Sequence, residues 1–373
     1  MIIQRTQKIE GELEPGRVLI IYGPRRVGKT TMLRGYLSTL GSKKVFSGQG
    51  DDIKLQELFS AQERNRLLEF ARPWEVIAID EAQQIPKIGI GIKMINDEYP
   101  NTIIILTGSS SFELAGQVGE PLTGRHFVMT LLPIALAESG LGVYDLRNRL
   151  EDFLIYGCYP EVLLAETPEK RTRILQELLS SYLYKDILAL DKVRSPAKLR
   201  DLARAIALQT GNDVSLGELA STVGLDAKTV ARYLDVLEKM FVIKRVGGLS
   251  RNLRSEISSK ARYFFLDTGV RNAVLDAFQP LSLRADIGGL WENFVFAELY
   301  KDSMRGRHLS DIYYFWRTHG GAEVDIVRER AGKLTAIECK WSKFTLPGKA
   351  WRDTYPESET ICITKHNFPD FLL

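Results

Sequence analysis

The chain has 373 residues, of which 45% are hydrophobic and 26% charged, and its formal net charge is +3. A chain of this length is too long for one compact core, so we expect two to four domains. The composition is that of a soluble globular protein, and a net charge this close to zero indicates no class of partner by itself.

Cysteines and apolar runs restrict the expected cellular location. Cys158, Cys339 and Cys362 are widely spaced and odd in number. They predict neither a metal-ligand pair nor a disulfide framework, which fits a reducing cytosol. The N-terminus has no stretch that resembles a signal peptide, and the apolar runs are too short to span a bilayer. We therefore expect a cytoplasmic protein with no membrane contact.

The first third of the chain alternates short apolar runs with helical patterns. Runs that are buried on both faces and separated by helices are typical of a parallel α/β sheet. We therefore expect a first α/β domain over residues 1–133. The apolar runs are Val18 to Tyr22, Val76 to Ile79, Ile103 to Leu106 and Phe127 to Leu132.

A predicted strand, Arg17 to Tyr22, leads directly into Gly-Pro-Arg-Arg-Val-Gly-Lys-Thr at residues 23–30. This is the P-loop pattern in its required context, after a strand and before a helix. The glycines let backbone N–H groups surround phosphates, Lys29 reaches the β and γ phosphates, and Thr30 ligates Mg²⁺. The pattern predicts ATP and Mg²⁺ as cofactors. The residues expected to bind nucleotide are Gly23, Pro24, Arg25, Arg26, Val27, Gly28, Lys29, Thr30 and Thr31.

Polar side chains follow two further predicted strands. The strand that begins at Val76 ends in two acids. We expect Asp80 to hold the Mg²⁺ shell and Glu81 to orient or deprotonate the attacking water. The next strand ends near Ser109, our candidate for a side chain that senses the γ-phosphate, with Thr107 close behind. A serine that merely caps a turn is the alternative.

Arg125, in Leu-Thr-Gly-Arg at residues 122–125, is a candidate arginine finger. Such a finger would reach the nucleotide of a neighbouring subunit. A surface salt bridge is the alternative interpretation. Nucleotides at subunit borders imply a homo-oligomer, with a ring as one arrangement.

Helical patterns dominate after the first domain and predict a helical lid over residues 134–195. Ser215 and Glu218 then form a capping box, and Gly224 ends the helix that begins there. Asp226 caps a second helix from Ala227 to Met240. Two short helices joined by a glycine turn make a helix-turn-helix, so we expect a winged helix over residues 196–266.

The second of these helices presents polar residues, Tyr233 among them, outside its apolar stripe, as a recognition helix does. Residues 241–262 hold six basic side chains and one acid, a local charge of +5. Basic surfaces of this kind favour phosphate contacts, and a winged helix that serves only protein packing is the alternative. The residues expected to contact DNA are Lys228, Thr229, Arg232, Arg251 and Arg254.

Two predicted strands near the C-terminus carry acids and a lysine and are separated by Ala331-Gly332. If the turn centres there, Asp325 pairs with Glu338, and Lys340 shares their face. Adjacent carboxylates repel unless a cation is present, so we expect Mg²⁺ there, with Lys340 positioning or activating water for phosphodiester cleavage. A cross-strand surface ladder of acids and lysine is the alternative.

This acid–lysine pattern resembles the PD-(D/E)XK nuclease fold, which implies a nuclease-like domain over residues 267–373. In that fold an acid from a preceding helix often joins the cluster, and Glu292 is the matching residue here. A retained but inactive nuclease fold is a further alternative. The metal ligands expected in the whole chain are Thr30, Asp80, Asp325, Glu338 and Glu292.

Nearly the whole chain resembles a bacterial and archaeal family of AAA-type ATPases with a nuclease-like C-terminal domain of unknown function. The resemblance implies a three-layer α/β ATPase domain that hydrolyses ATP, a winged helix and a nuclease-like fold. Cys158 stands where the family motif has glycine. The P-loop and the acid–lysine residues carry part of this family resemblance. The other motifs that carry the resemblance are Ile79-Asp-Glu, Leu106-Thr-Gly-Ser-Ser, Leu122-Thr-Gly-Arg, Tyr156-Gly-Cys-Tyr-Pro-Glu and Phe265-Leu-Asp-Thr-Gly.

We expect an oligomeric ATPase that binds DNA and carries a metal-dependent, nuclease-like domain. One alternative is a motor that binds or remodels branched DNA with an inactive nuclease fold. Another is a nucleotide switch that acts on protein partners and never cuts DNA.

Overall fold

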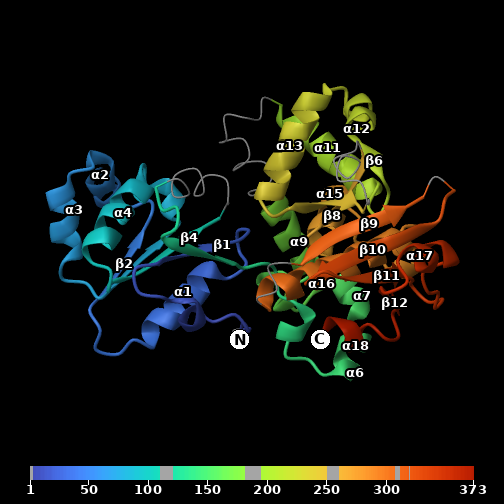
Figure 1. Ribbon diagram of the computed structural model, residues 1–373, viewed down its shortest axis with the longest axis horizontal. Coiled ribbons are helices and arrows are strands. Elements are labelled where there is room, and N and C mark those ends of the chain that lie inside the picture. The colour runs from blue at the N-terminus through green and yellow to red at the C-terminus, as the bar shows by residue number, and fades with distance from the viewer. Residues whose placement is uncertain (1–2, 110–120, 181–194, 250–259, 307–310, 319) are drawn as a thin grey trace. The chain divides into compact units, whose positions relative to one another are not determined.

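The structure, a computed structural model, describes residues 3–109, 121–180, 195–249, 260–306, 311–318 and 320–373 (Figure 1). It forms two compact units. The first consists of Arg5–Leu132 with Lys239–Phe241, and the second of Met1–Gln4, Pro133–Glu238 and Val242–Leu373. We call them the N-terminal unit and the C-terminal unit.

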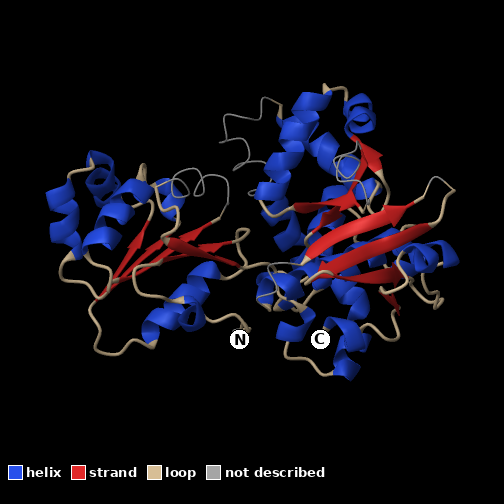
Figure 2. Ribbon diagram, in the orientation of Figure 1, coloured by secondary structure: helices blue, strands red, loops and turns tan. Residues whose placement is uncertain are grey.

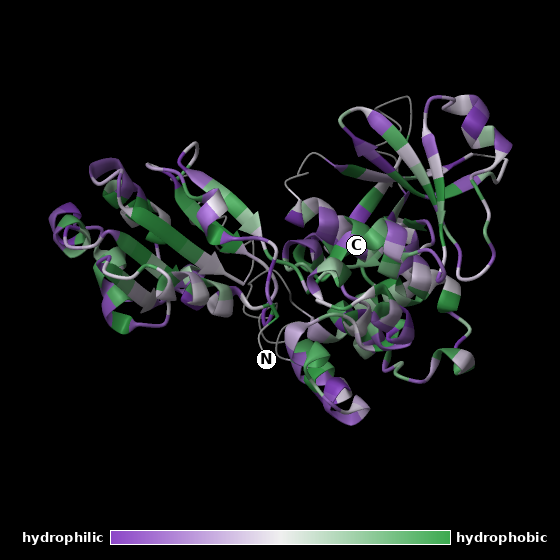
Figure 3. Cartoon of the chain, turned by 90° about the horizontal axis from the view of Figure 1, so that it is seen from below, coloured by the Kyte–Doolittle hydropathy of each residue, from purple (hydrophilic) through white to green (hydrophobic). Residues whose placement is uncertain are grey.

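A five-stranded parallel sheet forms the centre of the N-terminal unit, in the order β2-β3-β4-β1-β5. Its central strands are mostly apolar, as expected where both faces of a sheet are covered, and strands of this unit are coloured as hydrophobic in Figure 3. The sequence did not predict β2, which lies at an edge and is only partly buried. The strands are β1 (Val18–Tyr22), β2 (Val45–Gln49), β3 (Val76–Asp80), β4 (Ile103–Gly108) and β5 (His126–Thr130).

Helices cover both faces of this sheet and make three layers (Figures 1 and 2). On one face α1 (Lys29–Ser38) follows β1 directly. On the other face the apolar sides of three helices pack against alternate strand residues, among them Ile20, Ile77 and Leu106. These helices are α2 (Ile53–Ala61), α3 (Arg64–Ala71) and α4 (Ile88–Glu98), and two short 3₁₀ helices, η1 (Ile9–Glu12) and η2 (Ala82–Gln84), complete the unit.

The C-terminal unit contains a seven-stranded sheet in the order β12-β11-β10-β9-β7-β8-β6. We expected a domain boundary at residues 266/267, but this sheet continues across it, because β7 pairs with β9 in parallel. The expected winged-helix strands and nuclease-like strands therefore share one sheet. The strands are β6 (Val214–Ser215), β7 (Ile243–Gly248), β8 (Lys260–Phe265), β9 (Ile312–Arg317), β10 (Glu323–Arg330), β11 (Lys333–Cys339) and β12 (Glu359–Ile363).

Two helices of this unit begin at the capping residues that the sequence predicted. The Ser215 hydroxyl accepts a hydrogen bond from the N–H of Glu218 at 3.1 Å, and Asp226 accepts one from Thr229 at 2.9 Å. Gly224 ends the first of these helices in the left-handed conformation, as expected. The helices are η3 (Leu136–Glu138), α6 (Val143–Asn148), α7 (Leu150–Tyr156), α8 (Pro160–Leu163), α9 (Pro168–Leu178), α11 (Pro196–Leu208), α12 (Leu216–Val223), α13 (Ala227–Lys239), α15 (Thr268–Leu275), η5 (Leu281–Leu283), α16 (Ile287–Arg305), α17 (Lys349–Thr354) and α18 (Pro369–Leu372).

Part of the expected lid is joined to the later elements by side chains of α15. Asn272 donates to the carbonyls of Leu154 and Ile155 at 2.9 and 2.8 Å, and Thr268 donates to the carbonyl of Phe153 at 2.8 Å. These carbonyls lie in the last turn of α7, where carbonyl groups lack helical partners or, like that of Phe153, have only the N–H of the C-cap residue Gly157. The contacts explain why residues from Pro133 onward belong to the C-terminal unit.

Two motifs that lie about a hundred residues apart in the chain meet beside this junction. The buried carboxylate of Asp267 accepts hydrogen bonds from the N–H groups of Cys158 at 2.7 Å and Val270 at 3.1 Å. A Cβ on Gly157 would lie 2.1 Å from this carboxylate, and one on Gly269 would lie 2.0 Å from the Tyr156 carbonyl. Because Cys158 contributes its backbone N–H here, its side chain can differ from the glycine of the family motif.

In the part of the chain that the structure describes, no helix is both long and apolar enough to cross a membrane.

Candidate functional site

The P-loop follows β1 with the backbone shape that a phosphate cradle needs. Gly23 has φ +153°, and a Cβ there would lie 2.0 Å from the carbonyl oxygen of Leu131. Gly28 has φ +98° and precedes α1, so the loop runs directly into a helix N-terminus. Glycine is required at both positions, since side chains are disfavoured at these angles. The free N–H groups at this end of α1 are suited to bind phosphate oxygens.

Lys29 is buried at the first position of α1. Its ammonium donates hydrogen bonds to the carbonyl oxygens of Gly23 and Pro24, both at 2.9 Å. Burial lowers the pKa of Lys29 to about 8, against the attraction of Glu81 and Asp80. An anionic phosphate in the loop would offset that desolvation, so the site as built favours a negatively charged ligand.

Asp80 ends β3 and joins the P-loop to the neighbouring strand. One of its oxygens accepts a hydrogen bond from the Thr30 hydroxyl at 2.6 Å, and the other accepts one from the Thr107 hydroxyl on β4. The sheet order explains this contact, because β4 lies between β1 and β3 and all three end at the same edge. Oxygen ligands from Thr30 and Asp80 suit Mg²⁺.

Glu81 follows Asp80 and has φ +51°, an uncommon left-handed conformation for a side chain of this size. Its N–H donates to the Thr107 hydroxyl at 3.1 Å. The Gln83 amide donates to the Glu81 carboxylate at 2.6 Å and to the Ser109 hydroxyl at 3.1 Å. Ser109 is therefore linked to Glu81 through Gln83, whereas Thr107 contacts both acids directly. From the sequence we had placed Ser109 ahead of Thr107 as the side chain that senses the γ-phosphate, which stays a prediction.

Other residues of the expected nucleotide site have different environments. Val27 is fully buried, and its carbonyl accepts a hydrogen bond from Arg5 at 2.6 Å. Arg26 lies exposed with φ +61°, and Thr31 is exposed on α1. Arg5 also donates to the Leu132 carbonyl at 2.9 Å, so it fixes the loop to the end of β5. The sequence carried no local signal for this role of Arg5.

Arg125 forms a surface ion pair with Asp97 at 2.7 Å, and both side chains are about two-fifths exposed. The salt bridge, which was the alternative to an arginine finger, is thus present within the chain. Exposed pairs of this type are weak, about 0–1 kcal/mol, so the pair would not by itself hold Arg125 in place.

The helix α13 presents part of the expected DNA-contact surface. Lys228 and Arg232 are exposed and lie four residues apart, one turn along the helix, and Thr229 is partly exposed. Tyr233, expected on the same surface, is instead buried at 1% exposure. Its ring packs into the unit and its hydroxyl accepts a hydrogen bond from the N–H of Ser195.

The basic segment after α13 is less available than its composition indicates. Lys244 pairs with Glu238 at 2.6 Å, and Arg262 is buried among carboxylates. Arg251 and Arg254 lie outside the described residues. The local charge of +5 therefore overstates what a nucleic acid could contact, because sequence composition does not distinguish paired from exposed bases.

The C-terminal hairpin has the register that the sequence predicted. Ala331 and Gly332 both have positive φ, +49° and +77°, as a two-residue hairpin turn requires. The pairing of β10 with β11 places Ile326 opposite Ile337, the neighbours of Asp325 and Glu338. The next positions along the two strands are then Asp325 and Glu338 themselves.

Lys340 lies between these two carboxylates. Its ammonium is 2.9 Å from Asp325 and 2.7 Å from Glu338. Asp325 also accepts a hydrogen bond from the N–H of Cys339 at 2.8 Å. Burial, followed by the charge of Asp325, raises the pKa of Glu338 to about 7. The three side chains form one polar cluster on one face of the hairpin.

Glu292 approaches this cluster from α16, but its carboxylate pairs with Arg262 at 3.2 Å. Among the residues that the structure describes, no group of three or more His, Cys, Asp or Glu side chains is arranged to hold a metal ion. In this arrangement Asp325, Glu338 and Glu292 are not brought together as such a group, and the expected metal site stays a prediction. The physical reason is that Lys340 and Arg262 already neutralise these carboxylates.

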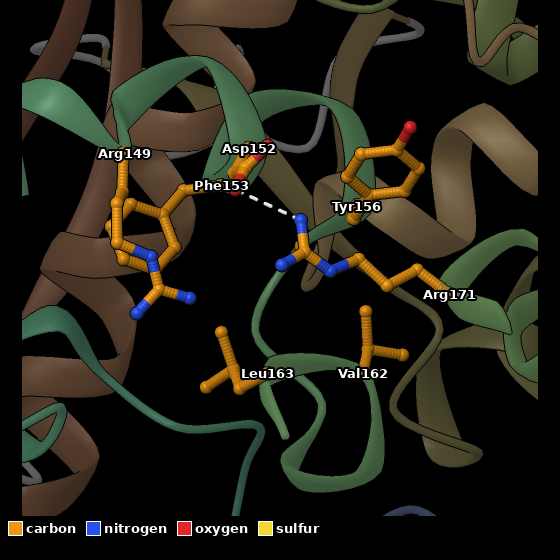
Figure 4. Close-up of a pocket in the computed structure, with 8 residues that line it drawn as sticks. Arg149, Asp152, Phe153, Tyr156, Val162, Leu163 and Arg171 are labelled. Atoms are coloured by element: carbon orange, nitrogen blue, oxygen red, sulfur yellow. Dashed lines mark ion pairs between the residues drawn. The ribbon is translucent and has the colours of Figure 1, made fainter. Parts of the chain in front are cut away.

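A small hollow lies beside α7 in the C-terminal unit (Figure 4). Arg171 pairs there with Asp152 at 2.8 Å, and Arg149 lies over the ring of Phe153. The hollow has room for about one water molecule, so it is too small for a nucleotide or a metabolite.

Residues 15–139 match the family model described as an AAA domain. Together with the P-loop geometry, this match identifies the segment as an AAA-type P-loop ATPase domain. Residues 147–281 and 287–352 match two models described as domains of unknown function, DUF8612 and DUF4143.

Uncharacterized proteins of other organisms match most of the chain. An uncharacterized protein of Mycobacterium tuberculosis is 27% identical over 351 residues, which cover 91% of this chain and 74% of that protein. An uncharacterized protein of Haemophilus influenzae is 26% identical over 376 residues, which cover 95% of this chain and 88% of that protein. Among solved structures, AMPPCP-bound DnaA from Aquifex aeolicus is 15% identical over 60% of this chain and 81% of its own, with a TM-score of 0.27, too low to support an inference.

Proposed function

We propose that the protein hydrolyses ATP in the N-terminal unit. The observation that carries this proposal is the placement of Asp80, whose two oxygens accept hydrogen bonds from Thr30 in the P-loop and Thr107 on β4. An acid in this position connects the phosphate cradle to the strand that lies beside it. The connection completes a Mg²⁺–nucleotide site, and Glu81 beside it provides the carboxylate that turnover needs.

Each side chain has a role that follows from its position. Lys29 and the N–H groups at the start of α1 bind the β and γ phosphates. Thr30 and Asp80 would hold Mg²⁺, which would neutralise charge on the phosphates. Glu81 orients or deprotonates the attacking water, and Gln83 and Thr107 hold Glu81 in place.

We further propose that α13 contacts DNA. The order of elements α11, β6, α12, α13, β7 and β8, with β8 paired to both β6 and β7, is that expected of a winged helix. The exposed Lys228 and Arg232 then lie on the second helix of the helix-turn-helix.

The experiment that tests both proposals is a measurement of ATPase rate with no DNA and with single-stranded, duplex and four-way DNA. ATP turnover without DNA supports the first proposal, and stimulation by one DNA form supports the second. Turnover that no DNA changes would favour a nucleotide switch that acts on protein partners. Comparison of the three forms identifies the preferred structure, and sedimentation with and without nucleotide tests for the expected homo-oligomer.

The acid–lysine cluster supports a second candidate function, phosphodiester cleavage, because Lys340 lies within hydrogen-bond distance of both Asp325 and Glu338. Incubation of DNA with Mg²⁺ or Mn²⁺ tests it, with Asp325→Ala as the control. Cleavage by the parent chain alone would support a nuclease. Cleavage by neither would favour an ATP-driven DNA-binding protein with an inactive nuclease fold.

A further inference from the structure

Arg262 lies at the centre of a buried group of acids in the C-terminal unit. Its side chain is 3% exposed and forms ion pairs with Asp213 at 2.9 Å, Glu292 at 3.2 Å and Glu323 at 3.4 Å. It also donates to the backbone carbonyl of Asp325 at 3.2 Å. Its guanidinium lies over the ring of Phe315, with 4.8 Å to the ring centroid.

These acids come from three separate parts of the chain. Asp213 precedes β6, Glu292 lies on α16, and Glu323 and Asp325 lie on β10. Arg262 belongs to β8, which also pairs with β6 and β7. A single guanidinium therefore joins the sheet edge beside α13 to the hairpin that carries the acid–lysine cluster.

The charges around Arg262 explain why a cation is needed there. Asp213 and Glu292 are nearly buried, with side chains 6% and 12% exposed, and like charges brought this close repel in a medium of low dielectric. Burial is the largest influence on the pKa of Glu292 and raises it well above its usual range, Asp325 raises it further, and Arg262 opposes this increase. Arg317 offers partial compensation from the surface, where it pairs with Asp213 at 3.2 Å.

We propose that Arg262 is the resident cation of this acid group, occupying the place where a nuclease-like centre would hold a divalent metal ion. Glu292 would take part both in the arrangement that holds Arg262 and in an arrangement that holds a metal ion. In the first it pairs with Arg262, and in the second it would turn toward Asp325 and a metal. With Arg262 present, the group is neutralised without metal, which accounts for the absence of a metal-holding geometry among the described residues.

A consequence is that metal affinity at this centre depends on a side chain from β8. Withdrawal of Arg262 leaves Glu292 without its paired cation and leaves Asp213 with Arg317 at the surface, while Asp325 keeps Lys340. Carboxylate oxygens in excess of positive charge are the ligands that Mg²⁺ and Mn²⁺ prefer. This inference concerns cation occupancy at this centre, so it is separate from ATP hydrolysis. Metal-dependent DNA cleavage that Asp325→Ala abolishes would count against it.

The test measures Mn²⁺ binding to the full-length, nucleotide-free chain. Asp80→Ala serves as the parent, because it removes the P-loop carboxylate that could also bind Mn²⁺. We expect the parent to bind no Mn²⁺ at this centre tighter than about 1 mM. Adding Arg262→Gln should create one new Mn²⁺ site per chain with a Kd at least about tenfold lower, and Mn²⁺ should raise the melting temperature of this variant alone.

Matched variants separate this outcome from a general loss of charge. Lys260→Gln removes an exposed base from the same strand and should create no site. Adding Glu292→Gln to the Arg262→Gln variant should abolish the new site. A folded Arg262→Gln variant with no gain in Mn²⁺ affinity would show the proposal to be wrong.

A further measurement does not depend on any Arg262 variant being folded. If Arg262 is the resident cation, Asp325→Asn should leave the Mn²⁺ affinity of the parent unchanged, because no metal site is present to lose. Loss of a saturable Mn²⁺ site in this variant would mean that metal binds beside Arg262, and the proposal would fail.

Discussion

At the scale of single residues, the two acids at the end of β3 differ in how they are held. Asp80 is buried at 6% exposure and accepts two hydroxyl hydrogen bonds, whereas Glu81 is partly exposed and is held by Gln83. The first environment suits a charge that remains in place beside a metal ion. The second leaves a carboxylate able to meet water.

This difference predicts distinct effects of two substitutions. Glu81→Gln should retain ATP binding and reduce turnover by about 10²-fold or more, since the amide can orient but cannot accept a proton. Lys29→Ala should lose nucleotide affinity instead, because the phosphates lose their buried counter-charge. Nucleotide titration and phosphate release measured on both variants check this division. Normal turnover in Glu81→Gln would remove Glu81 from the mechanism.

The relative importance of Thr107 and Ser109 can be tested in the same assay. Thr107→Val removes the hydroxyl that contacts Asp80 and the N–H of Glu81, while keeping the side-chain volume. We expect a loss in kcat of about 10-fold or more, as one positioning hydrogen bond is worth about 1–2 kcal/mol. Thr107→Ser should restore most of it, and Ser109→Ala should have the smaller effect. The reverse order would restore Ser109 as the principal polar group.

At the scale of elements, α13 is an amphipathic helix whose apolar side, with Val230, Leu234 and Leu237, is buried. Its exposed side carries Lys228 and Arg232. An exposed basic face is compatible both with DNA contact and with a solvated surface, so only a salt-dependent measurement distinguishes them.

We expect Lys228→Ala combined with Arg232→Ala to weaken DNA binding and to reduce the slope of log K against log salt by about 1.8, at about 0.9 for each lost phosphate contact. The matched control, Lys170→Ala with Arg173→Ala, removes two exposed bases from α9 and should leave the slope unchanged. Equal slopes in all three proteins would assign the helix-turn-helix to packing alone.

At the scale of the whole molecule, the C-terminal unit is held together by buried arginines that connect distant segments. Arg271 and Arg284 have side chains 2% and 1% exposed, and both pair with Asp286, at 2.8 and 2.7 Å. Arg271 also donates to the carbonyl of Ala207 at 2.8 Å, which joins α15 to α11. Removing the shared carboxylate would leave two buried cations without a charged partner.

Asp286→Asn should therefore lower the free energy of unfolding of this unit by about 2 kcal/mol at pH 7. The loss is smaller than for a fully buried ion pair, because the Asp286 side chain is 40% exposed. The hydrogen bond from Arg284, and then that from Arg271, hold the pKa of Asp286 well below its usual range. A carboxyl group whose pKa is lower in the folded than in the unfolded chain stabilises the fold at pH values above its unfolded pKa of about 3.9. This stabilisation is lost as the pH falls below that value.

The parent and the Asp286→Asn variant should thus differ at neutral pH and converge as the pH decreases below about 4. Urea unfolding followed by tryptophan fluorescence measures this, because four of the five tryptophans lie in the C-terminal unit. Asp353→Asn, at an exposed position on α17, is the control and should match the parent throughout. A constant difference between parent and variant at every pH would exclude the ionic explanation.

The sequence alone determined those features whose physical requirements are met by neighbouring residues. The P-loop, the capping residues Ser215 and Asp226, and the hairpin turn at Ala331-Gly332 each depend on a short contiguous pattern. Backbone angles, helix ends and hairpin register are set locally, so these features and the meeting of Asp325 with Lys340 could be predicted.

Tertiary structure decided which side chains serve as partners across long distances in the chain. Arg262 was counted among exposed bases but is buried among acids that lie as far away as Asp213 and Glu323. Thr107 meets Asp80 because β4 is inserted between β1 and β3, an order that no local pattern specifies. A residue's type shows what it can bind, but its burial and its partners depend on how the strands are ordered and packed, and only the folded chain brings those groups together.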